Sequence, residues 1–433
     1  MNVLSIGGSD PSSGAGIQND IKTITSLDSY CFTVITAVTS QNTKKFFRVE
    51  PISPKMITIQ IDSILSDFKI DAIKIGMVYN SSIIKAIYSK IKRVKIPIIL
   101  DPVIKSTTGG VLMTKSSIPD YKKFLVPLGF VITPNKREGE ILSGIKIKTK
   151  NDLLKCAKKI KKIGTKNVII TGNRLEKNKI SDLILEDTRH HFNTTKKLSK
   201  LNHGSGCTYS SALTVCIANG KNISESSMFA QKYTVESIKL AEKLGMGIEI
   251  IKVPKIDPIK KNLKNAATRF VQIKNIYSLI PEVQTNFVFS RLNPKSTKDV
   301  IGINGRIIKS GKTVQVVGDF EYGGSQHVAT AILTINKKFP TIRSALNIKY
   351  NPKILKKFQS QGFRISDYER SKEPSAIKNK ENLTVTWGIK AAIKNFSQAP
   401  DIIFHKGGFG KEPMILVFGE EPNKVVDKIS RLF

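Results

Sequence analysis

The chain has 433 residues, of which 40% are hydrophobic, and its 70 lysine and arginine residues against 34 aspartate and glutamate residues give a formal net charge of +36. This length exceeds what one hydrophobic core ordinarily supports, so we expect two or three domains. No segment has the apolar length of a membrane span and the N-terminus shows no secretion signal, which excludes an integral membrane protein and predicts a cytoplasmic one.

The basic charge is compatible with two kinds of partner. Lysines are scattered along the chain, and residues 155–166 place them between apolar residues at helical spacing, which is typical of a solvated amphipathic helix. We therefore favour a lysine-rich surface that steers small anionic substrates over a nucleic-acid site. The cysteines are Cys31, Cys156, Cys207 and Cys216; they show no Cys-x-x-Cys spacing and predict reduced thiols.

A glycine- and serine-rich segment, residues 7–16, follows a strand-like run at residues 3–6 and leads into a helical pattern that begins near Ile17. Glycine lets backbone N–H groups approach an anion, and a helix start adds unpaired donors and a positive dipole end. Such a loop is more often structural than functional. It predicts a phosphate site only together with the segments that follow.

From residue 1 to about residue 251, short apolar runs alternate with helical patterns. This alternation predicts an α/β domain whose mostly parallel sheet is covered by helices on both faces. The predicted strands span residues 32–38, 72–77, 96–100, 130–133 and 168–171. Because ligands bind beyond the carboxyl ends of strands in such sheets, the polar residues at those ends are candidate site residues.

Three oxygen-bearing side chains follow two of these strands. Asp101 comes directly after the run 96–100, and Asn135 and Glu138 stand just past the run 130–133. Hard oxygen ligands suit Mg²⁺ where ATP phosphates must be held. Taken singly, Asp101 can instead begin a turn and Glu138 can cap a helix, and both alternatives stay open.

The segment 202–208 (NHGSGCT) opens an apolar helix. The backbone N–H groups from Gly204 through Ser205 and Gly206 to Cys207 would converge on one anion and neutralise charge on a transferring phosphoryl group. The helix start should depress the pKa of the Cys207 thiol, so this residue is the candidate base for an attacking hydroxyl. Cys216, on an apolar face of the same helix, is predicted to pack.

Residues 252–264 carry two prolines and a charge run without a strand pattern, and predict the junction between a first domain, residues 1–255, and a second, residues 262–433. The second unit shows helical periodicity over residues 263–279. Its strand-like runs are residues 287–289, 314–317, 402–405 and 415–418. Residues 311–313 (GKT) resemble the end of a Walker A loop, but position 306 is an arginine where that loop requires glycine, so we set it aside.

The second unit also offers arginines and polar loops flanked by glycine. Arg306, His327 and the segments 343–347, 366–374 and 407–413 are of this kind. A diphosphate-bearing substrate requires such groups, because guanidinium pairs with phosphate oxygens bidentately. A lone histidine is usually structural, so residue type alone gives His327 little weight.

The ordered segments GGSDPSSGAGIQNDIKT, ITAVTSQNT, KIGM, ILDPV, TPNKREGE and NHGSGCT closely resemble the hydroxymethylpyrimidine/phosphomethylpyrimidine kinases of thiamine biosynthesis. The resemblance covers roughly the first 250 residues. It implies a ribokinase-like, three-layer αβα domain with ATP and Mg²⁺ as cofactors. The implied reaction phosphorylates hydroxymethylpyrimidine and then its monophosphate to the diphosphate.

The same resemblance implies roles for individual residues. Asp20 and Gln41 would hold the pyrimidine, with Gly8 and Met77 lining its pocket; Cys207 would be the catalytic base, and Gly204, Ser205 and Gly206 the anion hole; Asp101, Asn135, Glu138 and Thr171 would serve the nucleotide, with Asp101 and Glu138 as metal ligands. One departure concerns the phosphate-binding cation. Such kinases often carry a lysine followed by two glycines where this chain has Thr171, Gly172 and Asn173, and Lys105 or Lys136 is the candidate replacement.

The segments EVQTN, NGRI, GGSQHVA, IRSALNIKY, EP, TWGI and GGFGKEPMI, from about residue 262 to the end, resemble the archaeal-type thiamine-phosphate synthase domain. The resemblance implies a smaller α/β domain with a mixed, class II aldolase-like sheet. It implies condensation of the pyrimidine diphosphate with thiazole phosphate, releasing pyrophosphate. Arg306, with Mg²⁺, would assist departure of the diphosphate, and His327 would contact that group or orient the thiazole phosphate.

We therefore predict a bifunctional enzyme that acts on small-molecule substrates as a homo-oligomer, without nucleic acid or membrane. One alternative keeps the kinase and makes the second unit a non-catalytic sensor of thiamine phosphate. The lack of a helix-turn-helix segment and the presence of Arg306 and His327 favour catalysis. Another alternative is a pyridoxal-type kinase. The pyrimidine substrate is favoured over pyridoxal by Gln41, Met77 and the fused synthase.

Overall fold

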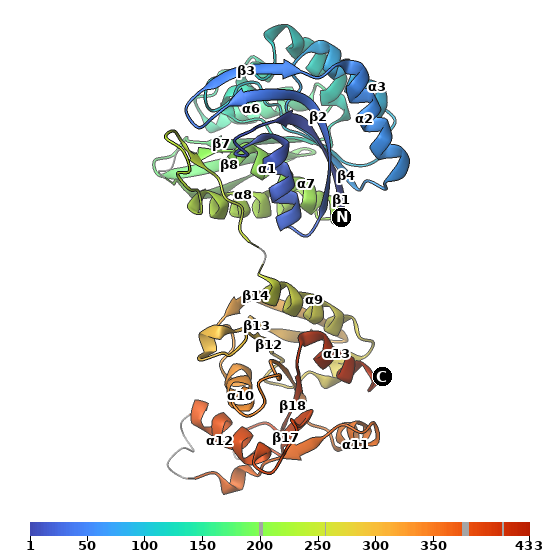
Figure 1. The fold of residues 1–433 in the computed structure, drawn as a ribbon, viewed down its shortest axis with the longest axis vertical. Coiled ribbons are helices and arrows are strands. Elements are labelled where there is room, and N and C mark those ends of the chain that lie inside the picture. Colours follow the sequence, from blue (N-terminus) through green and yellow to red (C-terminus); the bar gives the residue numbers. More distant parts are fainter. Residues whose placement is uncertain (199–201, 256, 375–380, 409–410) are drawn as a thin grey trace. The chain divides into compact units, whose positions relative to one another are not determined.

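Two α/β units follow one another along the chain, Met1–Lys255 and Ile256–Phe433. The structure is a computed structural model that describes residues 1–198, 202–255, 257–374, 381–408 and 411–433. Each unit has its own sheet and its own hydrophobic core, so each is described by itself (Figure 1).

The first unit alternates strands and helices, as the sequence predicts. Its strands are β1 (Asn2–Ser9), β2 (Tyr30–Gln41), β3 (Phe46–Pro51), β4 (Ala72–Ile75), β5 (Ile98–Leu100), β6 (Val131–Ile132), β7 (Asn167–Asn173), β8 (Lys179–Glu186), β9 (Arg189–Lys196), β10 (Asn202–His203) and β11 (Glu249–Ile250). Its helices are α1 (Gly16–Ser26), α2 (Pro54–Asp67), α3 (Ser81–Ile91), α4 (Ile118–Asp120), α5 (Lys136–Ser143), α6 (Lys150–Lys161), α7 (Ser205–Ala218) and α8 (Ile223–Lys239), with short turns of helix at Lys115–Ser117, Tyr121–Leu125 and Val126–Leu128.

Nine strands of the described residues form the main sheet of this unit, in the order β3-β2-β1-β4-β5-β6-β7-β8-β9. The strands from β2 to β7 are parallel, and β3, β8 and β9 pair antiparallel at the edges. The predicted mostly parallel sheet is therefore confirmed. The edge strands β3 and β9 have no buried residue, which is why the apolar pattern did not reveal them. Strand β8 was not predicted either, although five of its residues are buried.

Helices cover both faces of this sheet (Figure 1). On one face, α2, α3 and α6 contribute Ile57, Ile87 and Ile160 to a core with the strands. On the other face, α7 and α8 pack Leu213 and Ala230 against the strands. Because β1, β4, β5, β6 and β7 run in the same direction, the loops that follow them open at one edge of the sheet.

The second unit combines a mixed sheet with helices on both faces. Its strands are β12 (Phe287–Ser290), β13 (Val300–Ser310), β14 (Thr313–Tyr322), β15 (Ser344–Lys349), β16 (Ile365–Asp367), β17 (Ile402–His405) and β18 (Met414–Gly419). Its helices are α9 (Pro258–Gln272), α10 (His327–Asn336), α11 (Pro352–Ser360), α12 (Glu381–Ile393) and α13 (Pro422–Ser430), with single turns at Ile276–Leu279, Thr297–Asp299 and Arg370–Lys372.

The second sheet has the order β14-β13-β12-β15-β18-β17-β16, antiparallel except for the parallel pair β16 and β17. Helices α9, α11 and α13 pack on one face, and α10 and α12 pack on the other. The mixed sheet confirms the predicted fold class of this unit. The apolar runs predicted β12, β14, β17 and β18 but not β13, β15 or β16. Polar and glycine residues interrupt the buried positions of β13, and residues 343–347, expected as a polar loop, run into the buried strand β15.

The helix predicted over residues 263–279 begins earlier and ends earlier than expected. Asp257 caps α9 by accepting hydrogen bonds from the N–H groups of Ile259 and Lys260, and Pro258 occupies the first helical position. Proline is favoured there because that position needs no N–H donor. The predicted junction, residues 252–264, thus includes the first turns of a helix. Within the described residues, no helix is long and apolar enough to cross a bilayer.

Candidate functional site

A cavity of about 370 Å³ lies at the edge of the first sheet where the parallel strands end. Its lining includes the residues to which the resemblance assigned a role in the first site: Gly8, Asp20, Gln41, Met77, Asp101, Asn135, Glu138, Thr171, Gly204, Ser205, Gly206 and Cys207. These residues come from strand ends, loops and helices as far as about 200 positions apart in the chain. The fold therefore brings the predicted residues together in one place.

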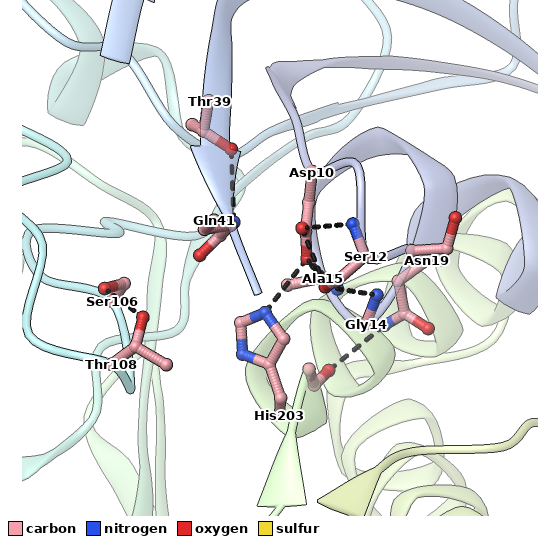
Figure 2. A network of polar contacts seen from close by, with 12 residues as sticks. Asp10, Ser12, Gly14, Ala15, Asn19, Thr39, Gln41, Ser106, Thr108 and His203 are labelled. Carbon is pink, nitrogen blue, oxygen red and sulfur yellow. Dashed lines mark hydrogen bonds and ion pairs between the residues drawn. The ribbon is translucent and has the colours of Figure 1, made fainter. Parts of the chain in front are cut away.

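The glycine-rich loop after β1 is held by the carboxylate of Asp10, which sequence reasoning did not single out (Figure 2). This carboxylate accepts hydrogen bonds from the N–H of Ser12 at 2.9 Å and the N–H of Ala15 at 2.8 Å, and pairs with Nε2 of His203 at 2.9 Å. Burial alone would raise the pKa of Asp10, but the bonds from His203, Ser12 and Ala15 outweigh it and lower the pKa. The His203 contact joins this loop to the segment that opens α7.

The same two segments touch through their backbones. Gly204 has φ +104°, and a Cβ placed on it would lie 1.8 Å from the carbonyl oxygen of Gly14. Asn19 donates from Nδ2 to the Gly204 carbonyl at 3.1 Å and to Oγ1 of Thr208 at 2.8 Å. Only glycine allows an approach this close, so position 204 is fixed by the packing of one loop on the other.

Helix α7 begins at Ser205 with Gly204 as its N-cap, and no side chain caps it. The first bond of the helix joins the N–H of Thr208 to the Gly204 carbonyl at 2.9 Å. The N–H groups of Ser205, Gly206 and Cys207 precede that bond and lie at the positive end of the helix dipole, beside the cavity. This is the geometry of an anion-binding helix start.

Lys74 is the main residue that the sequence analysis missed. It lies within β4 (AIKI), is 1% exposed, and places Nζ 2.8 and 2.9 Å from the two carboxylate oxygens of Asp20. Its distance to Oδ2 of Asp101 is 3.9 Å. The available signal was a lysine inside a four-residue strand that is otherwise apolar, since lysine is almost never fully buried unless it is paired.

Asp20 is engaged on all sides by the protein. In addition to Lys74, its carboxylate accepts hydrogen bonds from Oγ of Ser5 at 2.7 Å and Oγ of Ser211 at 2.8 Å. Burial alone would lower the pKa of Lys74, but Asp20 outweighs it and raises the pKa, so the ammonium stays charged. Asp20 thus holds a buried cation in the floor of the cavity.

The Cys207 thiol differs from the expectation. Helix position predicted a depressed pKa, but burial raises the pKa of Cys207 to about 12, although Lys74 and the N–H of Gly16 act to lower it. The prediction was wrong because desolvation of a thiolate in this enclosed site exceeds the effect of one helix start. Cys216 is buried, as expected for a packing residue, and all four cysteines are free thiols.

Asn135 and Glu138 form the cap of α5. Oδ1 of Asn135 accepts from the N–H of Glu138 at 3.1 Å, and Oε2 of Glu138 accepts from the N–H of Asn135 at 2.9 Å. Burial, and then the charge of Asp101, raise the pKa of Glu138 to about 8. Burial also raises the pKa of Asp101, whose Oδ2 accepts from Oγ of Ser210 at 2.9 Å. Glu138 therefore caps α5, as the alternative reading of the sequence predicted, and its carboxyl group also lines the cavity.

Gln41 and Met77 also line this cavity. Gln41 donates from Nε2 to Oγ1 of Thr39 at 3.2 Å, and its Oε1 is buried and, among the described residues, has no hydrogen-bond partner (Figure 2). A Cβ on Gly8 would lie 2.6 Å from Sδ of Met77. Gly8 and Met77 thus form an apolar surface, and the amide oxygen of Gln41 can accept a hydrogen bond from a ligand.

The segment that replaces the usual lysine is anchored by a buried acid. The N–H of Gly172 donates to Oδ1 of Asp182 at 2.8 Å, and Gln231 donates to Oδ2 at 2.8 Å. Burial raises the pKa of Asp182 to about 6. Of the two candidate replacements for the lysine, Lys105 lines the cavity, whereas Lys136 does not stand among its lining residues. Arg174 and Lys196, which the sequence analysis did not consider, also line it.

In the second unit, Arg306 lies in β13 opposite Val317 of β14, and its Nη1 donates to the Gly305 carbonyl at 2.7 Å. His327 is exposed at the first position of α10. The loop before it packs on β13, since a Cβ on Gly324 would lie 2.8 Å from the Gly302 carbonyl oxygen. Both residues thus belong to the region where α10 begins beside β13.

Two protein families match this chain. The phosphomethylpyrimidine kinase family matches residues 10–252, and the thiamine-phosphate synthase ThiN family matches residues 262–431. The chain is similar to the bifunctional thiamine biosynthesis protein ThiDN of Methanocaldococcus jannaschii, with 33% identity over 99% of this chain and 97% of that protein. It is also similar to thiamine-phosphate synthase ThiN of Methanothermobacter thermautotrophicus, with 36% identity over 39% of this chain and 88% of that protein.

Solved structures resemble the first unit. Pyridoxal kinase from Staphylococcus aureus in complex with ADP is 32% identical, covers 58% of this chain and 92% of its own, and has a TM-score of 0.54. The same kinase in complex with pyridoxal is 31% identical with the same coverage and TM-score. These likenesses support the predicted ribokinase-like architecture of the first unit.

We expect Gly204→Ala to destabilise the first unit, because a Cβ would overlap the Gly14 carbonyl and φ +104° is unfavourable for alanine. The expected cost is about 3 kcal/mol, or a fall in Tm of at least about 6 °C by scanning calorimetry. Gly206→Ala is the matched control, since a Cβ there meets nothing within 4 Å. An equal Tm for both variants would contradict the proposed contact between the loops.

We expect the metal-free protein to lose stability as the pH rises from 5 to 9, in part through Glu138. A carboxyl group whose pKa rises from 4.5 to about 8 on folding stabilises the folded state below pH 4.5, and this contribution is lost as the pH rises through 8. Glu138→Gln should flatten the dependence of Tm on pH, leaving a smaller slope from Asp101 and Asp182. Glu140→Gln, on the same helix but with a lowered pKa, should not flatten it; parallel curves for wild type and Glu138→Gln would refute the assignment.

Proposed function

This chain belongs to the bifunctional thiamine biosynthesis proteins in which a phosphomethylpyrimidine kinase precedes a ThiN-type thiamine-phosphate synthase, and on that premise we propose how its own residues perform both reactions. The kinase phosphorylates hydroxymethylpyrimidine and its monophosphate at the expense of ATP. The synthase condenses the resulting diphosphate with thiazole phosphate and releases pyrophosphate. One observation supports the kinase assignment above all: the start of α7, Cys207 and the buried ammonium of Lys74 meet in one cavity.

In the kinase, the substrate hydroxyl attacks the γ-phosphorus of ATP. The new O–P bond forms as the bond from the γ-phosphorus to the β–γ bridging oxygen breaks, and ADP leaves with that electron pair. The N–H groups of Ser205, Gly206 and Cys207 hold the charge of the migrating phosphoryl group. The proton of the hydroxyl passes to Sγ of Cys207 in its thiolate form, which burial disfavours and which Lys74 and the N–H of Gly16 favour.

Lys74 positions this chemistry. Its charge and the N–H of Gly16 both favour the thiolate of Cys207, against the burial that disfavours it. The four bonds to Asp20 from Lys74, Ser5 and Ser211 keep that carboxylate in place. Asp20 therefore acts through Lys74, whereas the sequence analysis had it touch the pyrimidine.

The pyrimidine binds between Gln41 and Met77. The unpartnered Oε1 of Gln41 accepts a hydrogen bond from an amino or hydroxyl group, and the Gly8–Met77 surface packs on the ring. Pyridoxal is the second candidate substrate, because pyridoxal kinases resemble the first unit. The similarity to a bifunctional thiamine biosynthesis protein extends over 99% of the chain and favours the pyrimidine.

Asp101 and Glu138 fit a magnesium ion that accompanies ATP. Both carboxyl groups are buried in the cavity and both have raised pKa values, so a cation placed between them and the nucleotide would relieve their mutual repulsion. Mg²⁺ commonly uses one or two carboxylates and completes its shell with phosphate oxygens and water. When bound, it supplies positive charge to the phosphates; Lys105, Arg174 and Lys196 add cations along the same cavity in place of the missing lysine.

In the synthase, the bond between the pyrimidinylmethyl carbon and the diphosphate oxygen breaks, and the thiazole nitrogen forms the new bond to that carbon. Arg306 pairs with the departing diphosphate, because a guanidinium matches phosphate oxygens in a planar fork. His327, exposed at the start of α10, contacts the same group or orients the thiazole phosphate. We also propose that the protein is cytoplasmic and forms a homo-oligomer. The four free cysteines support the first of these proposals, because thiols stay reduced in the cytoplasm.

Separate variants should disable the two reactions separately. In a single reaction with hydroxymethylpyrimidine, ATP, Mg²⁺ and thiazole phosphate, we expect Cys207→Ala to lower thiamine phosphate formation at least about 100-fold, because general-base catalysis is lost. With pyrimidine diphosphate supplied, the same variant should match wild type, whereas Arg306→Ala should fail in both assays. Wild-type yields from either variant in both assays would refute the site assignment.

Lys74→Met should cost about 3–5 kcal/mol of folding free energy, because it leaves the Asp20 carboxylate buried without its cation. The double variant Lys74→Met/Asp20→Asn should recover much of that stability but not the kinase activity. The rate of Cys207 alkylation, followed against pH, should shift to higher pH in the double variant. Wild-type kinase activity and an unshifted alkylation profile in a folded double variant would show that Lys74 is structural only.

A further inference from the structure

Polar side chains form a row along one end of the second sheet. Ile303 and Ile307 face the core beneath α9 and α13, so Arg306 lies on the opposite face of β13, toward α10. Ala345 of β15 and Ile403 of β17 belong to the core beneath α10 and α12, so Asn347 and His405, two residues further along each strand, lie on that same face. We call Arg306, Asn286, Asn347 and His405 the polar row.

One hydrogen bond joins the two asparagines of this row, and other contacts tie them to the neighbouring strands. Asn286 donates from Nδ2 to the Ile303 carbonyl at 2.9 Å and from its N–H to Oδ1 of Asn347 at 2.7 Å. Nδ2 of Asn347 contacts Sδ of Met414 at 3.3 Å, and Met414 pairs with His405. Four strand steps separate β13 from β17, which at about 4.8 Å per step is about 19 Å. Arg306 and His405 therefore lie at opposite ends of the polar row.

The far end of the row holds a second group of charged residues. It stands at the carboxyl ends of β16 and β17, the parallel pair of this sheet. The Tyr368 and His405 rings are 5.2 Å apart, and a Cβ on Gly408 would lie 3.8 Å from Cβ of Arg370. Ligands of open α/β sheets bind beyond the carboxyl ends of parallel strands.

The carboxylate of Glu373 is incompletely satisfied there. Nη2 of Arg370 is 3.8 Å from Oε2 of Glu373, with side chains 13% and 3% exposed, which is longer than a hydrogen-bonded pair. Oε1 of Glu373 is buried and has no hydrogen-bond partner within the part of the chain that the structure describes. Buried polar groups left in this state are uncommon and costly, and this oxygen, which can only accept, would take a hydrogen bond from a donor group.

His405 adds a donor beside Arg370. Its Nδ1 accepts from the N–H of Gly407 at 3.1 Å, and burial, with the charge of Arg370, lowers the pKa of His405 to about 4. The ring is therefore neutral at pH 7 and carries its proton on Nε2. A fork of guanidinium donors next to an imidazole N–H is suited to a phosphate group.

We propose that Arg370 and His405 bind the phosphate group of thiazole phosphate, at the end of the polar row opposite Arg306. This inference rests on the proposed synthase function and names the second anion subsite of that reaction. Arg306 holds the diphosphate of one substrate, and the phosphate of the other lies at the far end, with the reacting carbon and nitrogen between them. Glu373 orients Arg370.

The test measures binding of thiazole phosphate and of the dephosphorylated thiazole alcohol to the full chain by calorimetry. Arg370→Ala should weaken binding of thiazole phosphate by about 10- to 100-fold, the loss of charge-assisted hydrogen bonds, and leave binding of the alcohol within about twofold. Arg370→Lys keeps the charge without the fork and should lie between. In the synthase assay, KM for thiazole phosphate should rise while KM for pyrimidine diphosphate stays unchanged.

Lys372→Ala is the matched control, because it removes an exposed cation from the same turn, one that pairs only with Glu369 in the described contacts. It should behave as wild type. Equal loss of phosphate and alcohol binding, a rise in KM for pyrimidine diphosphate alone, or no change in either Arg370 variant would overturn the inference. A wild-type chain that binds thiazole phosphate through Arg370 but makes no thiamine phosphate would instead refute the proposed function and leave the subsite standing.

Discussion

The first unit depends on one buried ionic contact, between the Lys74 ammonium and the Asp20 carboxylate. Both groups are about 1% exposed, and the cation reaches within 3.9 Å of Asp101. An ion pair of this kind adds little stability over an apolar pair, but loss of one partner is expensive. Its presence beneath Cys207 and the start of α7 is therefore explained better by the charge it brings to the reaction than by folding.

The position of the anion-binding helix follows from backbone packing. The carbonyl of Gly14 lies where any side chain at Gly204 would stand, and Asp10 ties the same loop to His203. Two loops about 190 residues apart in sequence thus fix each other, one after β1 and one before α7. The first presents Gly16 to the Cys207 thiol, and the second presents three backbone donors to the cavity in which we propose that the phosphoryl group binds. Such rigid donors need little reorganisation during the reaction.

In the second unit, we propose that side chains rather than backbone N–H groups bind the phosphate groups of the substrates. Its sheet is mostly antiparallel, so few strands end together. Arg306 and Arg370 are carried by β13 and by the turn after β16, and asparagine bonds hold the strands between them in register. Two guanidinium groups far apart suit two phosphorylated substrates that must meet end to end. The first unit instead needs one anion site, because a single phosphoryl group moves there.

The sequence by itself determined the α/β class of both units, several of the strands with buried apolar runs, and a group of residues that line the first cavity, because strand ends and glycine loops leave local signals. The tertiary structure decided which charges meet. Lys74 gave only a weak local signal, and its partner Asp20 lies 54 positions away, so their pairing depended on the packing of α1 against β4. The raised pKa of Cys207 likewise arises from burial by distant segments, which overrides the local effect of the helix start. Desolvation and long-range pairing belong to the folded chain, and no short stretch of sequence contains them.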